Sequence, residues 1–432
     1  MSQDEPSPTE QLLETRITIE ESTNPKEILE HIHPSNLEMR HGFGLAGVGG
    51  LVALPVVLNT LTIAKLIASM YIITLAMSWD FVSGYTGQFS FGHALFFGLG
   101  GYTTAVLNIQ HGVSPLLTIP AGILLAAIAG VLIGVPALRI EGPYLALVTL
   151  IAPLILIQLL VVFNTGLQYI APEGLGGRSG IASPIQPFVG TSPQAIISVG
   201  DFETVILVEY FVGLIVALSM MAVMLLITRT TTGDIFTAIR EDEKAARACG
   251  INPAKFKIFA FVLSAAIAGF AGAMFVHSTA GDVQPAQLLV ISISINVVIM
   301  TVIGGLGTIV GAAVGALFFE GTRITFDIIS KDPYSVTVPV ADRTPSQLMP
   351  IPLLVVAALV TYYMRGGVLR EAIIRGRIFY MRWKIYGPKA YAKGLTIIAK
   401  ERIEERWSEF RVHAVEWRQR LAEVRQRIRK PR

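Results

Sequence analysis

The sequence predicts an all-α protein, a polytopic bundle of about ten helices that cross a membrane. Of the 432 residues, 52% are hydrophobic and only 15% are charged, and the mean hydropathy is +0.59. Soluble domains carry about a quarter charged residues. Because long apolar runs also fill the middle of the chain, lipid is the expected solvent for most of it.

Ten apolar segments approach the length of about 20 residues that a membrane-spanning helix needs. They cover residues 43–60, 62–82, 89–108, 115–137, 143–163, 205–228, 255–277, 287–304, 307–326 and 348–364. An even number of spans places both termini on the same side of the membrane. We therefore expect an N-terminal tail (residues 1–42), a membrane domain (43–364) and a C-terminal tail (365–432).

The distribution of Lys and Arg predicts the orientation. Basic residues collect between the sixth and seventh spans and after the tenth: Arg229, Arg240, Lys244, Arg247, Lys255 and Lys257, then Arg365, Arg370, Arg375, Arg377, Arg382 and Lys384. The loop from Asn164 to Thr204 holds a single basic residue, Arg178. Basic loops face the cytoplasm, so both termini are expected there. The N-terminal tail has nine acidic residues and no apolar run, which excludes a signal peptide.

The cytoplasmic loop 229–256 is expected to contain one amphipathic helix over 230–250. Thr232 or Asp234 can cap its start, and Gly250 can end it in the left-handed conformation. Asn252 can then cap the seventh span, with Pro253 in its first turn. An alanine-rich, charged helix at this surface is suited to dock in a groove of another protein. The alternative is a solvated loop with no partner.

The string from Ala238 to Asn252 resembles the coupling motif of branched-chain amino acid ABC permeases, with Ala245-Ala246 followed by Gly250. Lys244 departs from the usual Glu-Ala-Ala. Four further blocks are similar to the same family and appear in the expected order, so that the resemblance covers roughly residues 78–370. These blocks are 84–94, 138–149, 176–181 and 304–311.

This resemblance implies an importer of the ABC permease type in the cell membrane, carrying leucine, isoleucine, valine or a related small polar solute. Urea, amides and aromatic acids are alternative substrates. The implied partners are a second homologous permease, two cytoplasmic ABC ATPases and an extracytoplasmic solute-binding protein, and no nucleic acid. The residues implied in ATPase coupling are Arg240, Glu241, Asp242, Glu243, Ala245, Ala246 and Gly250.

The chain has no phosphate-binding Gly-x4-Gly-Lys-Ser/Thr motif, so ATP and magnesium are expected to be used by partner subunits only. Residues 42–47 match a dinucleotide fingerprint in letters, yet they open a membrane span rather than follow a strand. Cys249 is the single cysteine, and no Cys and His spacing indicates a metal site. We therefore expect a transporter subunit without catalytic residues or bound cofactors.

Polar and glycine residues interrupt the hydrophobic pattern over 84–92. Non-helical backbone at membrane depth is tolerated only when it is buried in protein or lines a wet cavity. The candidates for the substrate path are Gln88, Ser90 and His93, with Ser292, Ser294 and Asn296 as weaker ones. His93 has an equally good alternative, which is to satisfy a buried carbonyl near a helix start.

Two stripes of small residues indicate close helix packing. They are Gly307, Gly311 and Gly315 in the ninth span, and Ala265, Gly269 and Ala273 in the seventh. Glycine is also common in any membrane helix, which is the alternative explanation.

Apolar residues in the C-terminal tail follow a heptad spacing over 399–430, from Ile403 through Trp407 and Trp417 to Ile428. This pattern predicts a helix that docks on protein, or one that lies on anionic lipid. Two other functions stay open. A secondary transporter or channel would more often carry acidic or basic groups inside its spans, which this sequence largely lacks. A membrane-anchored scaffold would not need ten spans.

Overall fold

The computed structural model describes residues 39–137, 144–164, 174–176, 180–181, 187–191, 195–279, 281, 283–284, 288–331, 350–363, 367–368 and 371. The chain divides into two compact units, Met1–Glu371 and Ala372–Arg432, and all of these residues belong to the first. The heptad helix predicted over 399–430 and most of the N-terminal tail lie outside the described residues.

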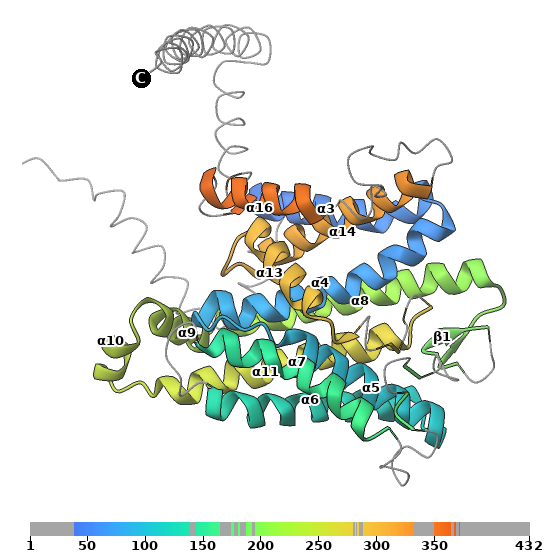
Figure 1. Ribbon diagram of the computed structural model, residues 1–432. Helices are drawn as coiled ribbons and strands as arrows, with labels where there is room; N and C mark the ends of the chain where they lie inside the picture. Colours follow the sequence, from blue (N-terminus) through green and yellow to red (C-terminus); the bar gives the residue numbers. More distant parts are fainter. Residues whose placement is uncertain are drawn as a thin grey trace, which may run out of the picture. The chain divides into compact units, whose positions relative to one another are not determined.

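The described part is almost entirely helical (Figure 1). Its helices are α3 (Met39–Val57), α4 (Thr60–Thr86), α5 (His93–His111), α6 (Pro115–Ala137), α7 (Tyr144–Val162), α8 (Phe202–Thr228), α9 (Thr231–Glu241), α10 (Glu243–Ala248), α11 (Pro253–Val276), α13 (Ile291–Gly304), α14 (Ile309–Lys331) and α16 (Pro350–Tyr363). The predicted all-α membrane bundle is confirmed, and each of the ten expected segments contains a helix. Among the described residues, six helices are long and apolar enough to cross a membrane, namely α4, α6, α7, α8, α11 and α14. The predicted count of ten spans is therefore approximate.

Helix α11 is the central packing element, in contact with α4, α5 and α6. A Cβ on Gly272 would lie 1.9 Å from the carbonyl oxygen of Phe97, and one on Gly100 would lie 2.0 Å from that of Gly269. Helix backbones can approach this closely only where glycine leaves out the side chain. The resulting van der Waals contact holds the helices together in lipid, where no hydrophobic effect drives their association. Ala265 and Ala273 of the same stripe are fully buried.

Helices α13 and α14 form a tight hairpin. A Cβ on Gly315 would lie 2.0 Å from the carbonyl oxygen of Met300, and one on Gly304 would lie 1.8 Å from that of Gly311. Gly307 was expected in the same helical stripe, and this prediction is wrong. Gly307 lies in the turn before α14 with φ +73°, a conformation that favours glycine.

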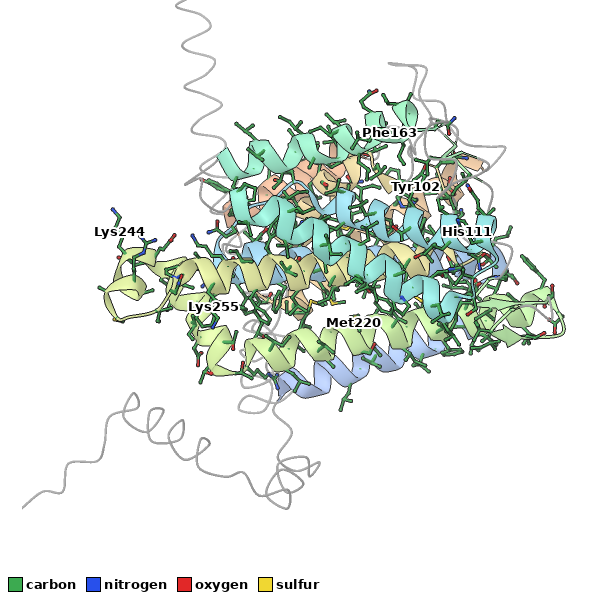
Figure 2. The ribbon with its side chains drawn as sticks, turned by 90° about the horizontal axis from the view of Figure 1, so that it is seen from below. Tyr102, His111, Phe163, Met220, Lys244 and Lys255 are labelled. Atoms are coloured by element: carbon green, nitrogen blue, oxygen red, sulfur yellow. The ribbon has the colours of Figure 1, made fainter. Side chains whose placement is uncertain are left out.

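The two ends of the bundle carry different structures. Helices α9 and α10 lie at one end, and the paired strands β1 (Val189–Gly190) and β2 (Ile197–Ser198) lie at the other (Figure 1). Figure 2 shows Lys244 and Lys255 at one end and His111 at the far one. The basic loop 229–256 and the described residues of the loop between α7 and α8 thus occupy opposite ends.

Four charged side chains are buried among the described residues, more than the sequence led us to expect: Asp80, Glu209, Lys257 and Glu320. Each has a partner on another segment or an adjacent turn. Glu209 accepts hydrogen bonds from Thr279, and Glu320 accepts from Ser69 and pairs with Arg323. Charges in membrane helices are costly without such partners.

We expect Gly272→Ala to destabilise the bundle by about 1–3 kcal/mol, because its new methyl group would overlap the Phe97 carbonyl. Thermal unfolding of the detergent-solubilised protein measures this change. Gly49→Ala is the matched control, since nothing lies within 4 Å of a Cβ there. Alanine in that exposed helix should stabilise by about 0.5–1 kcal/mol. Equal shifts for both variants would contradict the packing described for α11.

Candidate functional site

The segment between α8 and α11 forms two short helices rather than the single helix expected over 230–250. The break is at Asp242, whose backbone is extended (φ −153°, ψ 104°). Its carboxylate accepts hydrogen bonds from the backbone N–H of Lys244 at 2.8 Å and of Ala245 at 3.1 Å. Aspartate favours this capping arrangement over the helix interior, and so it ends α9 and starts α10.

The start of α9 also differs from the expectation. Neither Thr232 nor Asp234 caps it; the preceding residue is Thr230, whose side chain makes no capping bond and donates to the carbonyl of Ile227 at 2.7 Å. The end of the segment follows the sequence. Gly250 has φ +84°, and the Asn252 side chain accepts from Lys255 N at 3.4 Å to cap α11.

The inner face of α9 packs on the ends of α4 and α11. Phe236 is fully buried, with its ring edge-on to Phe81 at 5.7 Å between centroids and tilted against Phe259 at 6.3 Å. Ile239 is buried one turn later. These apolar contacts fix α9 against the bundle.

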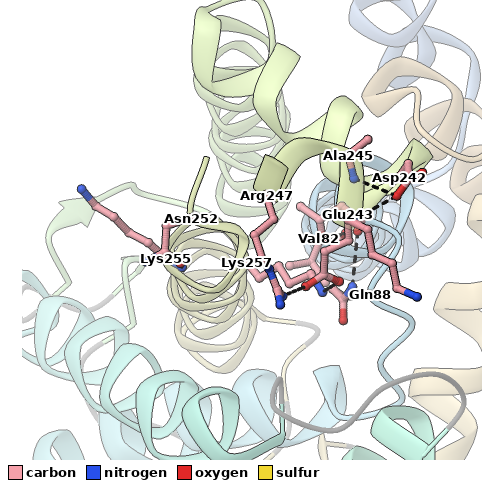
Figure 3. Close-up of polar contacts among 11 residues, drawn as sticks. Val82, Gln88, Asp242, Glu243, Ala245, Arg247, Asn252, Lys255 and Lys257 are labelled. Atoms are coloured by element: carbon pink, nitrogen blue, oxygen red, sulfur yellow. Dashed lines mark hydrogen bonds and ion pairs between the residues drawn. The ribbon is translucent and has the colours of Figure 1, made fainter. Parts of the chain in front are cut away.

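An ion pair fixes α10 in turn. Glu243 pairs with Lys257 of α11, and it also pairs with Arg247 within α10 at 3.1 Å (Figure 3). Lys257 is buried, so this pair is screened less by water than a surface pair. The two helices therefore form a docked unit, which we call the coupling segment (residues 230–250).

The seven residues implied in ATPase coupling divide between two faces. Ala246 is buried against the bundle and Glu243 is half-buried. Glu241, Asp242, Ala245 and Gly250 are exposed on the outer face, and Arg240 is partly exposed while its guanidinium donates to the Gly84 carbonyl of α4. The outer face is thus charged and alanine-containing, and the inner face is apolar.

Candidates for the substrate path lie at a break between α4 and α5, over residues 87–92. Ser90 is buried; its hydroxyl accepts from Gly92 N at 3.1 Å, and its carbonyl accepts from the Trp79 indole at 2.6 Å. Gln88 is half-buried, and the one hydrogen bond of its side chain to the described part of the chain is a 3.4 Å contact to the Thr86 carbonyl. Ser90 thus holds the break in shape, whereas Gln88 is loosely held.

His93 is fully buried at the first turn of α5. Its Nε2 lies 2.8 Å from the Ser264 hydroxyl, which itself donates to the Ser78 carbonyl at 2.6 Å. Because that hydroxyl proton is already used, Nε2 must donate to it. The other ring nitrogen, Nδ1, is buried and has no hydrogen-bond partner among the described residues. One side of the ring is therefore structural, and the other is open to a further donor.

Helix α13 contacts the start of α5 through Ser294, one of the weaker candidates from the sequence. Ser294 is buried, and its hydroxyl accepts from Ala94 N at 3.1 Å. Ser292 is exposed and Asn296 is half-buried on the same helix. Sequence reasoning also missed Asp80 and Ser264, although an acidic residue inside the apolar segment 62–82 was a usable signal for Asp80.

The family of this chain follows from its similarity to known proteins. A family model for the permease component of branched-chain amino acid transport systems matches residues 61–365. The chain belongs to this permease family. The permease is 30% identical over 315 residues to the high-affinity branched-chain amino acid transport system permease protein LivM of Escherichia coli K12, which is 70% of this chain and 72% of that protein.

A probable LivM permease of Methanocaldococcus jannaschii is 25% identical over 336 residues, covering 70% of this chain and 90% of that protein. No solved structure matches the permease. The family match runs from the second residue of α4 to just beyond α16, so α3 precedes the shared core. The chain is therefore an integral membrane permease, a transport subunit rather than an enzyme in itself, and it acts with other subunits.

We expect Asp242→Ala to loosen the start of α10 by about 1 kcal/mol, because two backbone N–H groups lose their acceptor. Hydrogen exchange at the Lys244 and Ala245 amides should accelerate about fivefold. Asp234→Ala is the control, since Asp234 caps no helix and should leave those two amides unchanged. Equal acceleration by both variants would show that Asp242 is not the cap.

Proposed function

We propose that this permease is the transmembrane subunit of an ATP-driven ABC importer that brings leucine, isoleucine and valine into the cytoplasm. The family match supports the transport class. The observation that carries the ATP-driven step is the coupling segment, docked on the bundle by Phe236 and Glu243 and presenting a charged outer face. Urea, amides and aromatic acids are the alternative substrates.

Two cytoplasmic ABC ATPases would bind the outer face of the coupling segments of this permease and of a second homologous permease. The exposed residues Glu241, Asp242, Ala245 and Gly250 are the proposed contacts. Binding and hydrolysis of ATP with magnesium would occur in those partners. A solute-binding protein would deliver its cargo at the opposite end of the bundle.

Solute is proposed to pass beside the break at residues 87–92. Gln88 is loosely held there, and His93 offers a buried Nδ1 to which none of the described residues donates. Asn296 and Ser292 extend polar groups along the neighbouring helix α13. ATP binding would shift the bundle between inward-open and outward-open states by favouring one of them, since a ligand acts only through its differential affinity.

A carrier that works without ATPases is the second candidate, and the buried carboxylates of Asp80, Glu209 and Glu320 favour it. Glu209 and Glu320 are occupied by bonds to Thr279, Ser69 and Arg323. That arrangement suits structural anchors better than groups that exchange an ion during each cycle.

Cys249 gives a direct test of orientation and docking, because it is exposed on the coupling segment and is the only cysteine in the sequence. A membrane-impermeant maleimide should label it in inside-out vesicles and not in right-side-out vesicles. Purified ATPase subunits should slow that labelling, because they cover the segment.

The control is Ser198→Cys in a Cys249→Ser background. Ser198 is exposed at the opposite end of the bundle and should be labelled from the other side only, with or without ATPases. Labelling of Cys249 from outside the cell, or labelling at an unchanged rate with the ATPases bound, would refute the proposed coupling.

A further inference from the structure

Arg240 reaches inward from the coupling segment although its side chain is 36% exposed. Its Nη1 donates to the carbonyl oxygen of Gly84 at 2.7 Å. Gly84 lies in the last turn of α4, where carbonyl groups lack partners within the helix and attract cations. The side-chain stem passes close to Gly87, at which a Cβ would be 3.2 Å from Arg240 Cγ.

The turn between α13 and α14 meets the same guanidinium from the other side. A Cβ on Gly307 would lie 2.8 Å from Arg240 Nη1 and 3.1 Å from the Gly84 carbonyl oxygen. A Cβ on Gly84 would in turn lie 2.5 Å from Gly307 N. α4, the turn and the guanidinium can converge at this point because Gly84 and Gly307 both lack a side chain.

A buried carboxyl group lies behind this point. The Asp80 carboxylate is fully buried and faces the backbone of Gly307 and Thr308; Gly307 N donates to Oδ1 at 2.8 Å. Oδ2 has no hydrogen bond of normal geometry among the described residues. Arg240 interacts electrostatically with this carboxylate. Moving the guanidinium away would take a cation from this buried carboxyl group and leave it only its backbone hydrogen bonds, which is unfavourable.

We propose that Arg240 is the positioning residue that carries movement of the coupling segment to the α13–α14 turn. The inference rests on the proposed function and names the route inside the permease. Because Arg240 contacts α4 and the turn together, displacement of α9 by the ATPases moves both.

From the turn, the movement reaches the break beside α5 along α13. Ser294, which caps Ala94 N, lies ten residues before Gly304 on that helix, about 15 Å along its axis. Helix α13 therefore ends beside Arg240, and about 15 Å earlier its Ser294 is hydrogen-bonded to the start of α5, next to His93.

The test uses the complete complex, reconstituted with its ATPases and binding protein, and measures uptake of labelled leucine and ATP hydrolysis. Arg240→Met should lower uptake about threefold to thirtyfold, and binding protein loaded with leucine should no longer stimulate hydrolysis. The ATPases should still protect Cys249, because Arg240 acts on the inner side. Arg240→Lys should restore part of the uptake, and Lys255→Met, an exposed cation of α11, should behave as the unchanged protein.

A second variant disturbs the contact between Arg240 and the α13–α14 turn by a change in the turn. Gly307→Ala would push a methyl group against Arg240 Nη1, whereas Gly112→Ala has similar positive φ but nothing within 4 Å. Gly307→Ala should therefore uncouple transport and Gly112→Ala should not. In an Asp80→Asn background, which keeps the acceptor for Gly307 N, Arg240→Met should cost less thermal stability than it does alone.

Two results would overturn the proposal. One is uptake by Arg240→Met equal to that of Lys255→Met; the other is loss of Cys249 protection in Arg240→Met, which would make Arg240 an ATPase contact instead. If Arg240→Met does not accumulate in the membrane, uptake and Cys249 protection are measured in Arg240→Lys and Gly307→Ala instead. Uptake by both variants equal to that of their controls, Lys255→Met and Gly112→Ala, would then overturn the proposal. Failure of Cys249 protection in the unchanged protein would refute the proposed function, a separate outcome.

Discussion

Backbone groups inside a bilayer find no water, so every break in a membrane helix has to be satisfied by protein. The break at residues 87–92 meets this requirement with side chains from other helices. Phe91 N donates to the Thr149 hydroxyl of α7 at 3.0 Å, and Ala94 N donates to the Ser294 hydroxyl of α13 at 3.1 Å. The break thus ties α4, α5, α7 and α13 to one point, and it explains why hydroxyl groups occur in otherwise apolar segments.

Close glycine contacts determine which parts of the bundle can move as units. Gly272 and Gly100 hold α11 and α5 at backbone contact, and Gly304 and Gly315 do the same for α13 and α14. Sliding either pair would drive atoms into overlap in a close-packed interior. The hairpin and the α4–α5–α11 body meet instead mainly through polar side-chain contacts: Ser294 and Asp80 bond backbone N–H groups, and Ser69 and Lys65 of α4 bond Glu320 and Asp327 of α14.

The sequence predicted the helices and some of their caps, but not the contacts between residues far apart in the chain. Apolar runs located ten of the twelve described helices, and Asn252 with Pro253 located the start of α11, because these signals act over a few residues. The break at Asp242 was missed because capping competes locally with a helix that the flanking alanines favour. The positions of Gly307 and Asp80 depend on partners more than 200 residues away, and no spacing within either segment encodes them.

Charge is distributed along the bundle in a way that bears on solute passage. Glu243 with Lys257, and Asp80 with Arg240, lie near the coupling segment. Glu209 with Thr279, and Lys65 with Asp327, lie toward the other end, where α8 and α4 begin and α14 ends. Around His93 the side chains of Ser264 and Ser294 are polar but uncharged. In the proposed path an amino acid would meet these neutral groups, which would orient it without a strong ion pair and let it leave as readily as it enters. The Glu243–Lys257 and Lys65–Asp327 ion pairs, by contrast, tie helices together at the two ends of the bundle.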